Sequence, residues 1–291
     1  MKTSTISCDS CKIRHVAVGE AVGDLYIPHP GNAPWPSVVI LNSSAGVCET
    51  RERFYARFLA AHGIAALVVD SFTPRGVKQT TTDQSQFNDI DMEQDAYAAY
   101  DLLATTPGFD SRHIAAMGVS KGGFVVINTA LTVRRRTFNR PSHDFSVRVA
   151  LVPPAHLQQR DARTDGRPLL ILLAEKDDYT GVRGAMGYAA RMIAAGNSPV
   201  EVRVYPGAHH AFERTGSLLY LARAENFSRR LFMVEDNGTV SDEAGRHMTR
   251  EEFLERRHEY LTLGAHAGGG TEELKELVAG DICQFLAANI G

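Results

Sequence analysis

The segment Gly118-Val119-Ser120-Lys121-Gly122-Gly123 decides the fold that the sequence predicts. It follows an apolar run at residues 113–117, typical of a buried strand, and precedes residues 124–131, whose pattern predicts a helix. A serine in a GxSxG pattern between a strand and a helix lies on a sharp, strained turn, where side chains at the flanking positions would collide. Gly118 and Gly122 leave that room. The segment therefore predicts a nucleophilic Ser120, presented at the end of a strand.

Short apolar runs rich in β-branched residues alternate with helical patterns on both sides of this turn. Strands are predicted at 12–18, 23–27, 37–41, 65–70, 113–117, 147–152, 169–173 and 200–205, and helices at 49–62, 92–104, 124–131, 184–195 and 272–288. This alternation is typical of a mostly parallel central sheet, here of about eight strands, with helices on both faces. The first two strands are expected to be antiparallel. A chain of 291 residues can form one such α/β domain over 1–291.

Residues 213–268 interrupt the alternation. Apolar residues at 231–234 and 239–240 flank Asn237-Gly238, which predicts a tight β-hairpin because both turn residues tolerate positive φ. Thr249 and Glu252 then form a capping-box pattern that predicts a helix to about residue 260. We expect this segment to be an insertion or flap packed on the core, either flanking the active-site mouth or forming a dimer contact.

Composition excludes several other classes of protein. The 34 acidic and 31 basic residues give a net charge of -3, so no basic field indicates a nucleic-acid partner. No apolar stretch is long enough for a signal peptide or a membrane span, so we expect no membrane association and a cytoplasmic location. Cys8-Asp9-Ser10-Cys11 has no second ligand pair for zinc, so we expect no metal and free, reduced cysteines.

A serine nucleophile needs a base, and the base needs an orienting carboxylate. Residues 174–178 (AEKDD) follow the predicted strand at 169–173, and residues 206–212 (PGAHHAF) follow the one at 200–205. Both segments lie at carboxyl ends of strands, where open α/β sheets form their sites. The acid is therefore Asp177 or Asp178, and the base is His209 or His210.

These segments together resemble the dienelactone hydrolase family, from about Val22 to Phe212. The resemblance implies the α/β-hydrolase fold, with Asp177 as the acid and His210 as the base. Asp178 is then a local hydrogen-bonding or capping residue, and His209 a neighbour of the base. The resembling pieces are Gly46, DSFTPRG at 70–76, the Ser120 turn, KDD at 176–178 and YPGAHHAF at 205–212.

The resemblance also indicates which groups would bind the oxyanion and the substrate. One oxyanion donor is the backbone N–H of Lys121, because the fold takes it from the residue after the nucleophile. Matching Gly46 to the family's glycine makes Ser44 the second donor, with Ala45 as the alternative. Arg75 lies where family members hold an arginine near a substrate carboxylate, and it either takes that role or forms a structural salt bridge.

The sequence departs from the family's namesakes at the nucleophile. Those enzymes use cysteine and carry a glutamate in the first oxyanion loop, whereas this chain has Ser120 and Ser43. We therefore expect a small carboxylic ester or lactone as substrate, in place of dienelactone itself, cleaved through an acyl-enzyme without a cofactor. Acyl transfer and amide or C–C hydrolysis would use the same triad, and an inactive binding protein is the alternative from another class. A homodimer is compatible with the sequence.

Overall fold

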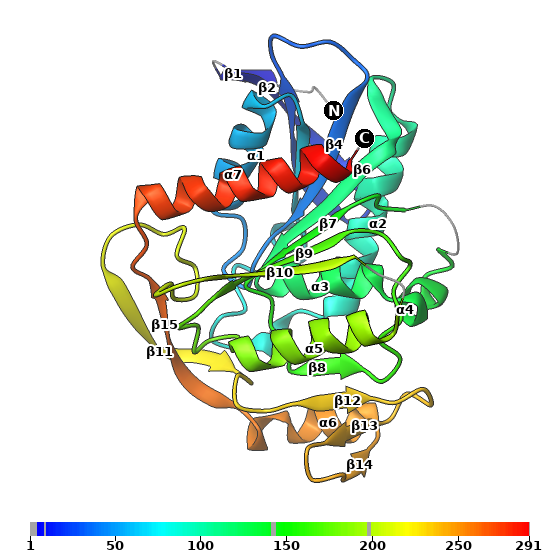
Figure 1. Ribbon diagram of the computed structural model, residues 1–291, viewed down its shortest axis with the longest axis vertical. Helices are drawn as coiled ribbons and strands as arrows, with labels where there is room; N and C mark the ends of the chain where they lie inside the picture. The colour runs from blue at the N-terminus through cyan, green and yellow to red at the C-terminus, as the bar shows by residue number, and fades with distance from the viewer. Residues whose placement is uncertain (1–4, 9, 141–143, 197–198, 291) are drawn as a thin grey trace.

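A nine-stranded sheet forms the centre of the protein in the computed structural model, which describes residues 5–8, 10–140, 144–196 and 199–290 (Figure 1). Its strand order is β1-β2-β3-β5-β4-β6-β7-β9-β10. The pairs among β1, β2, β3 and β5 are antiparallel, and those from β5 to β10 are parallel. The strands are β1 (Thr5–Cys8), β2 (Cys11–Val18), β3 (Ala21–Pro28), β4 (Trp35–Leu41), β5 (Ala65–Asp70), β6 (Phe109–Val119), β7 (Arg148–Leu151), β9 (Leu169–Ala174) and β10 (Val200–Tyr205).

Helices cover both faces of this sheet, which confirms the predicted α/β fold (Figure 1). Alternate residues of each central strand point to opposite faces: Val38 and Ile40 pack towards α1 and α7, whereas Val39 and Leu41 pack on the face covered by α2 and α3. The helix α5 continues that second cover over β9. The helices are α1 (Glu52–Ala61), α2 (Asp89–Thr105), α3 (Lys121–Ala130), α4 (Thr132–Thr137), α5 (Val182–Ala194) and α7 (Glu272–Asn289).

The eight predicted strands are all present, and β1 is the additional ninth. Two helix starts differ from the prediction for local reasons. The helix α2 starts at Asp89, before the predicted residue 92, because the Asn88 side chain caps it by accepting the N–H of Ile90 at 3.1 Å. The helix α1 starts at Glu52, after the predicted residue 49, because the preceding residues belong to a loop that Glu52 holds in place. None of the described helices is long and apolar enough to cross a membrane.

The prediction of free cysteines is wrong for Cys11, which is disulfide-bonded, and confirmed for Cys48 and Cys283. The register of β1 and β2 places Cys8 opposite Cys11. The side chain of Cys8 lies outside the part of the chain that the structure describes. Free thiols therefore no longer support a cytoplasmic location, which stays a prediction.

Residues 213–268 form two small β structures and a helix below the main sheet in Figure 1. The predicted hairpin is present as β12 (Phe232–Val234) and β13 (Val240–Asp242), and the capping box of Thr249 and Glu252 starts α6 (Arg250–Arg256). Four unpredicted strands complete these two structures, namely β8 (Leu157–Gln159), β11 (Leu218–Asn226), β14 (His247–Met248) and β15 (Thr262–Gly268). The strands β11 and β15 form an antiparallel ribbon, and β8 joins β12, β13 and β14 in a four-stranded sheet.

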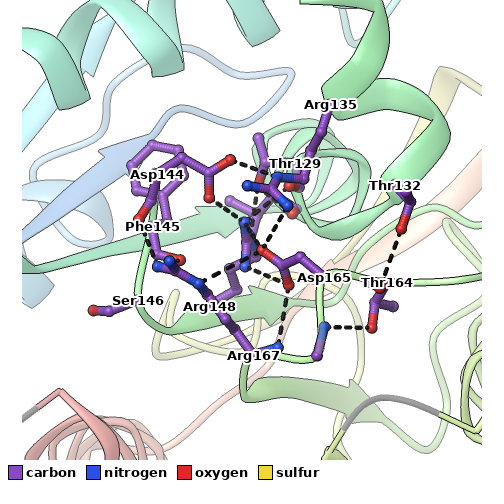
Figure 2. Close-up of polar contacts among 12 residues, drawn as sticks. Thr129, Thr132, Arg135, Asp144, Phe145, Ser146, Arg148, Thr164, Asp165 and Arg167 are labelled. Carbon is purple, nitrogen blue, oxygen red and sulfur yellow. Dashed lines mark hydrogen bonds and ion pairs between the residues drawn. The ribbon is translucent and has the colours of Figure 1, made fainter. Parts of the chain in front are cut away.

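A buried charge network fixes the amino end of β7 to the end of the nucleophile helix (Figure 2). Arg148 is fully buried and contacts Asp144 at 2.7 Å and Asp165 at 2.9 Å. Its guanidinium also donates to the Thr129 carbonyl at 2.9 Å, and Arg135 donates to Asp144 at 2.7 Å. Thr129 lies near the end of α3, so this network holds the helix at the end opposite Ser120.

Candidate active site

Ser120 occupies the predicted turn between β6 and α3. Its φ of 52° and ψ of −114° are strained for a residue with a side chain, and its N–H donates to the Leu151 carbonyl at 2.8 Å. A Cβ on Gly118 would lie 2.2 Å from the Gly122 carbonyl carbon, and one on Gly122 would lie 2.6 Å from the Leu41 oxygen. The two flanking glycines are therefore required for the close approach of strand and helix.

Asp177 and His210 form a buried pair at the carboxyl ends of β9 and β10. The His210 Nδ1 lies 2.8 Å from Asp177 Oδ2. The other carboxylate oxygen, Oδ1, accepts the N–H groups of Tyr179 at 2.9 Å and Thr180 at 2.8 Å, and the Thr180 hydroxyl donates to Oδ2 at 2.7 Å. Since Asp177 occupies Nδ1, the Nε2 of His210 is the nitrogen left for a proton transfer.

The same contacts keep Asp177 ionised. Burial alone would raise the pKa of Asp177, but the charge and hydrogen bond of His210, together with the hydrogen bonds from Thr180, outweigh it and lower the pKa below its ordinary value. A carboxylate that stays ionised can orient the imidazole and stabilise its protonated form.

The neighbours of these two residues have different partners. Asp178 accepts the backbone N–H of His266 at 2.8 Å and lies 2.7 Å from its Nδ1, so it connects the acid loop to β15. The Nδ1 of His209 is buried without a hydrogen-bond partner among the described residues. The structure thus pairs Asp177 with His210 and places Asp178 and His209 outside that pair.

A pocket of about 440 Å³ opens at this edge of the sheet. Ser44, Ser120 and Lys121 all line it, as do Tyr179 and Thr180 from the acid loop. The Tyr179 ring lies 4.7 Å from the His210 ring, measured between centroids. The nucleophile turn and the expected oxyanion donors therefore line one pocket, and the acid loop that also lines it carries Asp177, the partner of His210.

Residues 213–268 supply nine of the residues that line the pocket. Both the core and the segment contribute aromatic rings to the pocket wall. Two charged lining residues are paired: Lys121 lies 2.8 Å from Asp89, and Arg257 lies 2.6 Å from Glu225. The lining residues from the segment are Glu225, Asn226, Phe227, Ser228, Val240, Arg250, Phe253, Leu254 and Arg257.

His156 is a pocket residue that the sequence did not reveal. It lies beyond β7 and stacks on Phe227 with a centroid distance of 4.6 Å. Burial lowers the pKa of His156 to about 4, so the ring is neutral at neutral pH. Neither His156 nor Phe227 belongs to a recognisable motif, and the only signal was the position of His156 shortly after a strand next to the nucleophile strand.

Arg75 does not reach the pocket, so its proposed substrate role is not supported. Its guanidinium makes a bidentate ion pair with the buried Asp95, at 2.8 and 2.9 Å, and donates to the Ser71 carbonyl at 2.8 Å. These contacts occupy N–H groups at the edge of the guanidinium that would otherwise bind a substrate carboxylate. The salt-bridge alternative describes Arg75 correctly.

The N–H groups of the loop at residues 42–48, called here the oxyanion loop, differ in whether they have a hydrogen-bond acceptor. The N–H of Ser43 donates to Glu52 at 3.1 Å, that of Ala45 to the Ser43 hydroxyl at 3.1 Å, and that of Gly46 to the Ser43 carbonyl at 2.9 Å. In the described part of the chain, the Ser44 N–H has no acceptor, and Ser44 lines the pocket. This arrangement favours Ser44 over Ala45 as the second donor.

Known structures share this fold at low sequence identity. A dienelactone hydrolase-like promiscuous phosphotriesterase, P91 from metagenomic libraries, matches with a TM-score of 0.58 and 18% identity over 97% of this chain and 100% of its own. The thermophilic esterase Est2 of Thermogutta terrifontis matches with a TM-score of 0.56 and 16% identity, over 70% and 84%. MGS-M1, an α/β-hydrolase from a deep-sea metagenome library, gives 0.53 and 14%, over 72% and 87%.

Sequence comparison gives the family. No curated protein matches the chain. The profile of the dienelactone hydrolase family matches residues 24–232, which include the oxyanion loop, the nucleophile turn and both segments that carry Asp177 and His210. The chain therefore belongs to the dienelactone hydrolase family, a family of hydrolases that act on ester bonds.

Proposed function

We propose that this protein is a serine esterase that cleaves a small carboxylic ester or lactone through an acyl-enzyme. One observation carries the proposal: Ser120, on its strained positive-φ turn, opens into the same pocket that the buried Asp177–His210 pair adjoins through Tyr179 and Thr180. A hydroxyl, a base and an orienting acid act together in serine hydrolases, and the shared pocket supports these three roles for Ser120, His210 and Asp177.

Each group has a definite task in this reaction. The Ser120 hydroxyl attacks the ester carbonyl while His210 Nε2 takes its proton, and Asp177 stabilises the resulting imidazolium. The N–H groups of Lys121 and Ser44 bind the oxyanion; Lys121 is the first residue of α3, so its N–H has no partner within the helix. His210 then returns the proton to the leaving alcohol, and water removes the acyl group by the reverse sequence.

The pocket supports a small and largely apolar substrate. Its volume of about 440 Å³ is within the range of small-molecule sites, and its walls include Phe87, Phe124, Phe227 and Phe253. Two of the cations that line it are already paired with carboxylates, and His156 is neutral. An uncharged ester of short to medium acyl length therefore fits best.

A panel of p-nitrophenyl esters of graded acyl length, with simple lactones alongside, tests this proposal. We expect turnover that is highest for short and medium acyl chains and falls when the chain exceeds the pocket. Product analysis in the presence of alcohol and amine acceptors separates hydrolysis from acyl transfer or amide chemistry. The proposal fails if no ester or lactone is turned over, or if the Ser120→Ala variant retains the wild-type rate.

A further inference from the structure

Arg51, Glu52 and Glu213 form a cluster of buried charged side chains beside the oxyanion loop. Arg51 and Glu52 are at the start of α1, and Glu213 is in the segment that follows His210. Glu52 and Glu213 are 0% and 1% exposed, and Arg51 is 8% exposed. Charges are rarely buried unless they pair or hydrogen-bond, so the position of this cluster needs a physical reason. The cluster takes no direct part in the proposed chemistry.

Glu52 holds the two ends of the loop. Its Oε1 accepts the N–H of Ser43 at 3.1 Å, and its Oε2 accepts the N–H of Cys48 at 2.8 Å. Hydrogen bonds to an ionised acceptor are about twice as strong as neutral ones. One carboxylate at the start of α1 therefore fixes the loop on both sides of Ser44.

Arg51 holds the interior of the loop. Its Nη2 donates to the Ser43 hydroxyl through a very short contact, to the Gly46 carbonyl at 3.3 Å and towards the Cys48 sulfur at 3.1 Å. Its Nε donates to Glu52 at 2.9 Å. The planar guanidinium thus joins the carboxylate to the loop in a geometry that a lysine cannot reproduce.

Glu213 extends the cluster towards the catalytic base. Its Oε1 lies 3.7 Å from the Arg51 Nε, and neither carboxylate oxygen has a hydrogen-bond partner in the described part of the chain. Burial would lower the pKa of Arg51, but Glu52 and Glu213 outweigh it, so the guanidinium stays charged. Glu213 lies three residues after His210, so Arg51 lies between the oxyanion loop and the base loop.

We propose that Arg51 and Glu52 are positioning residues that clamp the oxyanion loop and leave the Ser44 N–H directed at the carbonyl oxygen of the substrate. The clamp satisfies the N–H groups of Ser43 and Cys48 directly and orients the Ser43 hydroxyl, which accepts from Ala45. Ser44 is left as the pocket-lining residue of this loop with an unused donor. This inference rests on the proposed esterase function.

The clamp also gives Ser43 a task. The namesake members of the family carry a glutamate at this position, whereas here the Ser43 hydroxyl accepts from both Arg51 and Ala45. A carboxylate at residue 43 would lie next to the Glu52 carboxylate, which already accepts the N–H of that residue. In this chain the carboxylate that shapes the loop comes from α1.

The decisive experiment compares Arg51→Lys with a control, Arg53→Lys. Arg53 lies in the first turn of α1, and its side chain is 41% exposed. Active sites are first titrated with a fluorophosphonate, so that kcat refers to functional enzyme only. The affinity of a trifluoromethyl ketone, which forms an oxyanion with the nucleophilic serine, is then measured on each variant. Removing one oxyanion donor lowers the rate by about 100- to 1,000-fold, and displacing the donor without removing it should lower the rate by a smaller factor.

We expect Arg51→Lys to lower kcat per titrated site by about 10- to 100-fold, to change KM by less than about threefold, and to weaken the ketone in proportion to kcat/KM. Arg53→Lys should leave all three values unchanged. A merely structural role would reduce the number of titrated sites and leave the kcat of each one intact, and that result would overturn the clamp.

Glu52→Gln provides a second variant should Arg51→Lys fold poorly. The glutamine amide replaces one carboxylate oxygen of residue 52 by an NH₂ group, a donor that faces a backbone N–H of the loop. One end of the loop therefore loses its hydrogen bond, while the side chain keeps its shape. The same fall in kcat per site is expected, and unchanged kcat and ketone affinity would again contradict the clamp. A wild-type enzyme that neither reacts with the fluorophosphonate nor turns over any ester would instead overturn the proposed function, and the clamp with it.

Discussion

Asp177 and Asp178 are adjacent in the chain but have different partners. Asp177 pairs with His210 inside the protein, and Asp178 pairs with the half-exposed His266 of β15. The short motif predicted Ser120, and the ends of two strands predicted the acid and base loops. The resemblance to the family then implied Asp177 and His210, which the structure pairs with each other. The sequence could not place Arg75, because nothing in it indicates that Asp95, on another element, would be its partner.

The different partners predict different effects of two matched substitutions. Asp177→Asn should lower kcat/KM by about 1,000- to 10,000-fold, because an amide at this position stabilises the wrong tautomer of His210. Asp178→Asn should lower it by less than about tenfold. Steady-state kinetics on one good ester decide between them, and equal losses in the two variants would contradict the assignment of the acid.

Asp177 should also leave a signature in the pH dependence of stability. Its pKa is lowered in the folded state, so the stability it contributes is present above the ordinary pKa of about 4 and is lost as the pH falls through the folded value. Urea unfolding between pH 3 and pH 6 should show a smaller loss of stability on acidification for Asp177→Asn than for the wild type. Parallel pH profiles of the two proteins would refute the depressed pKa.

At the scale of elements, the region after His210 shows where sequence patterns stop being informative. The β12–β13 hairpin and the start of α6 have local signals, namely Asn237-Gly238 and the capping box, and both were predicted. The strands β8, β11 and β15 were not, because they are specified by pairing between distant segments. The strand β8 pairs with β12 across a long sequence separation, and β11 carries exposed apolar residues that give no alternating pattern.

Phe232 is the buried centre of this region and therefore tests its contribution to the pocket. It contacts the rings of Phe227, Phe253 and Tyr260, two of which belong to residues that line the pocket. Phe232→Ala should cost about 3 to 5 kcal/mol of local stability and raise KM several-fold while kcat per titrated site changes little. Limited proteolysis should show earlier cleavage within 213–268.

The control for Phe232 is Leu277→Ala, which removes an exposed apolar side chain from α7. It should change neither KM nor the proteolysis pattern. An unchanged KM in Phe232→Ala, with earlier cleavage still observed, would show that the region packs on the enzyme without shaping its substrate pocket.

At the scale of the whole molecule, the main sheet was predictable because several of its central strands, such as β9, are continuous apolar runs, as expected when both faces are covered. The buried charge network of Arg148 was not, because its partners come from three separate loops and helices (Figure 2). Charged residues near turns are usually solvated, and only the folded structure shows that Asp144 and Asp165 enclose a guanidinium.

That network predicts a large effect on global stability. Arg148→Met removes a buried cation that pairs with both Asp144 and Asp165 and leaves Arg135, at 2.7 and 3.6 Å, to offset the two carboxylates. This loss should cost about 3 kcal/mol in the free energy of unfolding by urea. Arg112→Met, at a side chain that is 80% exposed, should leave the free energy of unfolding unchanged within experimental error. Equal stabilities of the two variants would mean that the network is dispensable.

The measurement that tests the central claim most directly is covalent labelling by a fluorophosphonate or by paraoxon, followed by mass spectrometry of the labelled peptide. Both compounds react with an activated serine hydroxyl and leave a covalent phosphorus adduct, so they probe the proposed nucleophile directly. The account predicts one adduct per chain on Ser120, lost in Ser120→Ala and retained in Ser228→Ala, a control serine that lines the same pocket. An adduct on another residue, or undiminished labelling of Ser120→Ala, would contradict it.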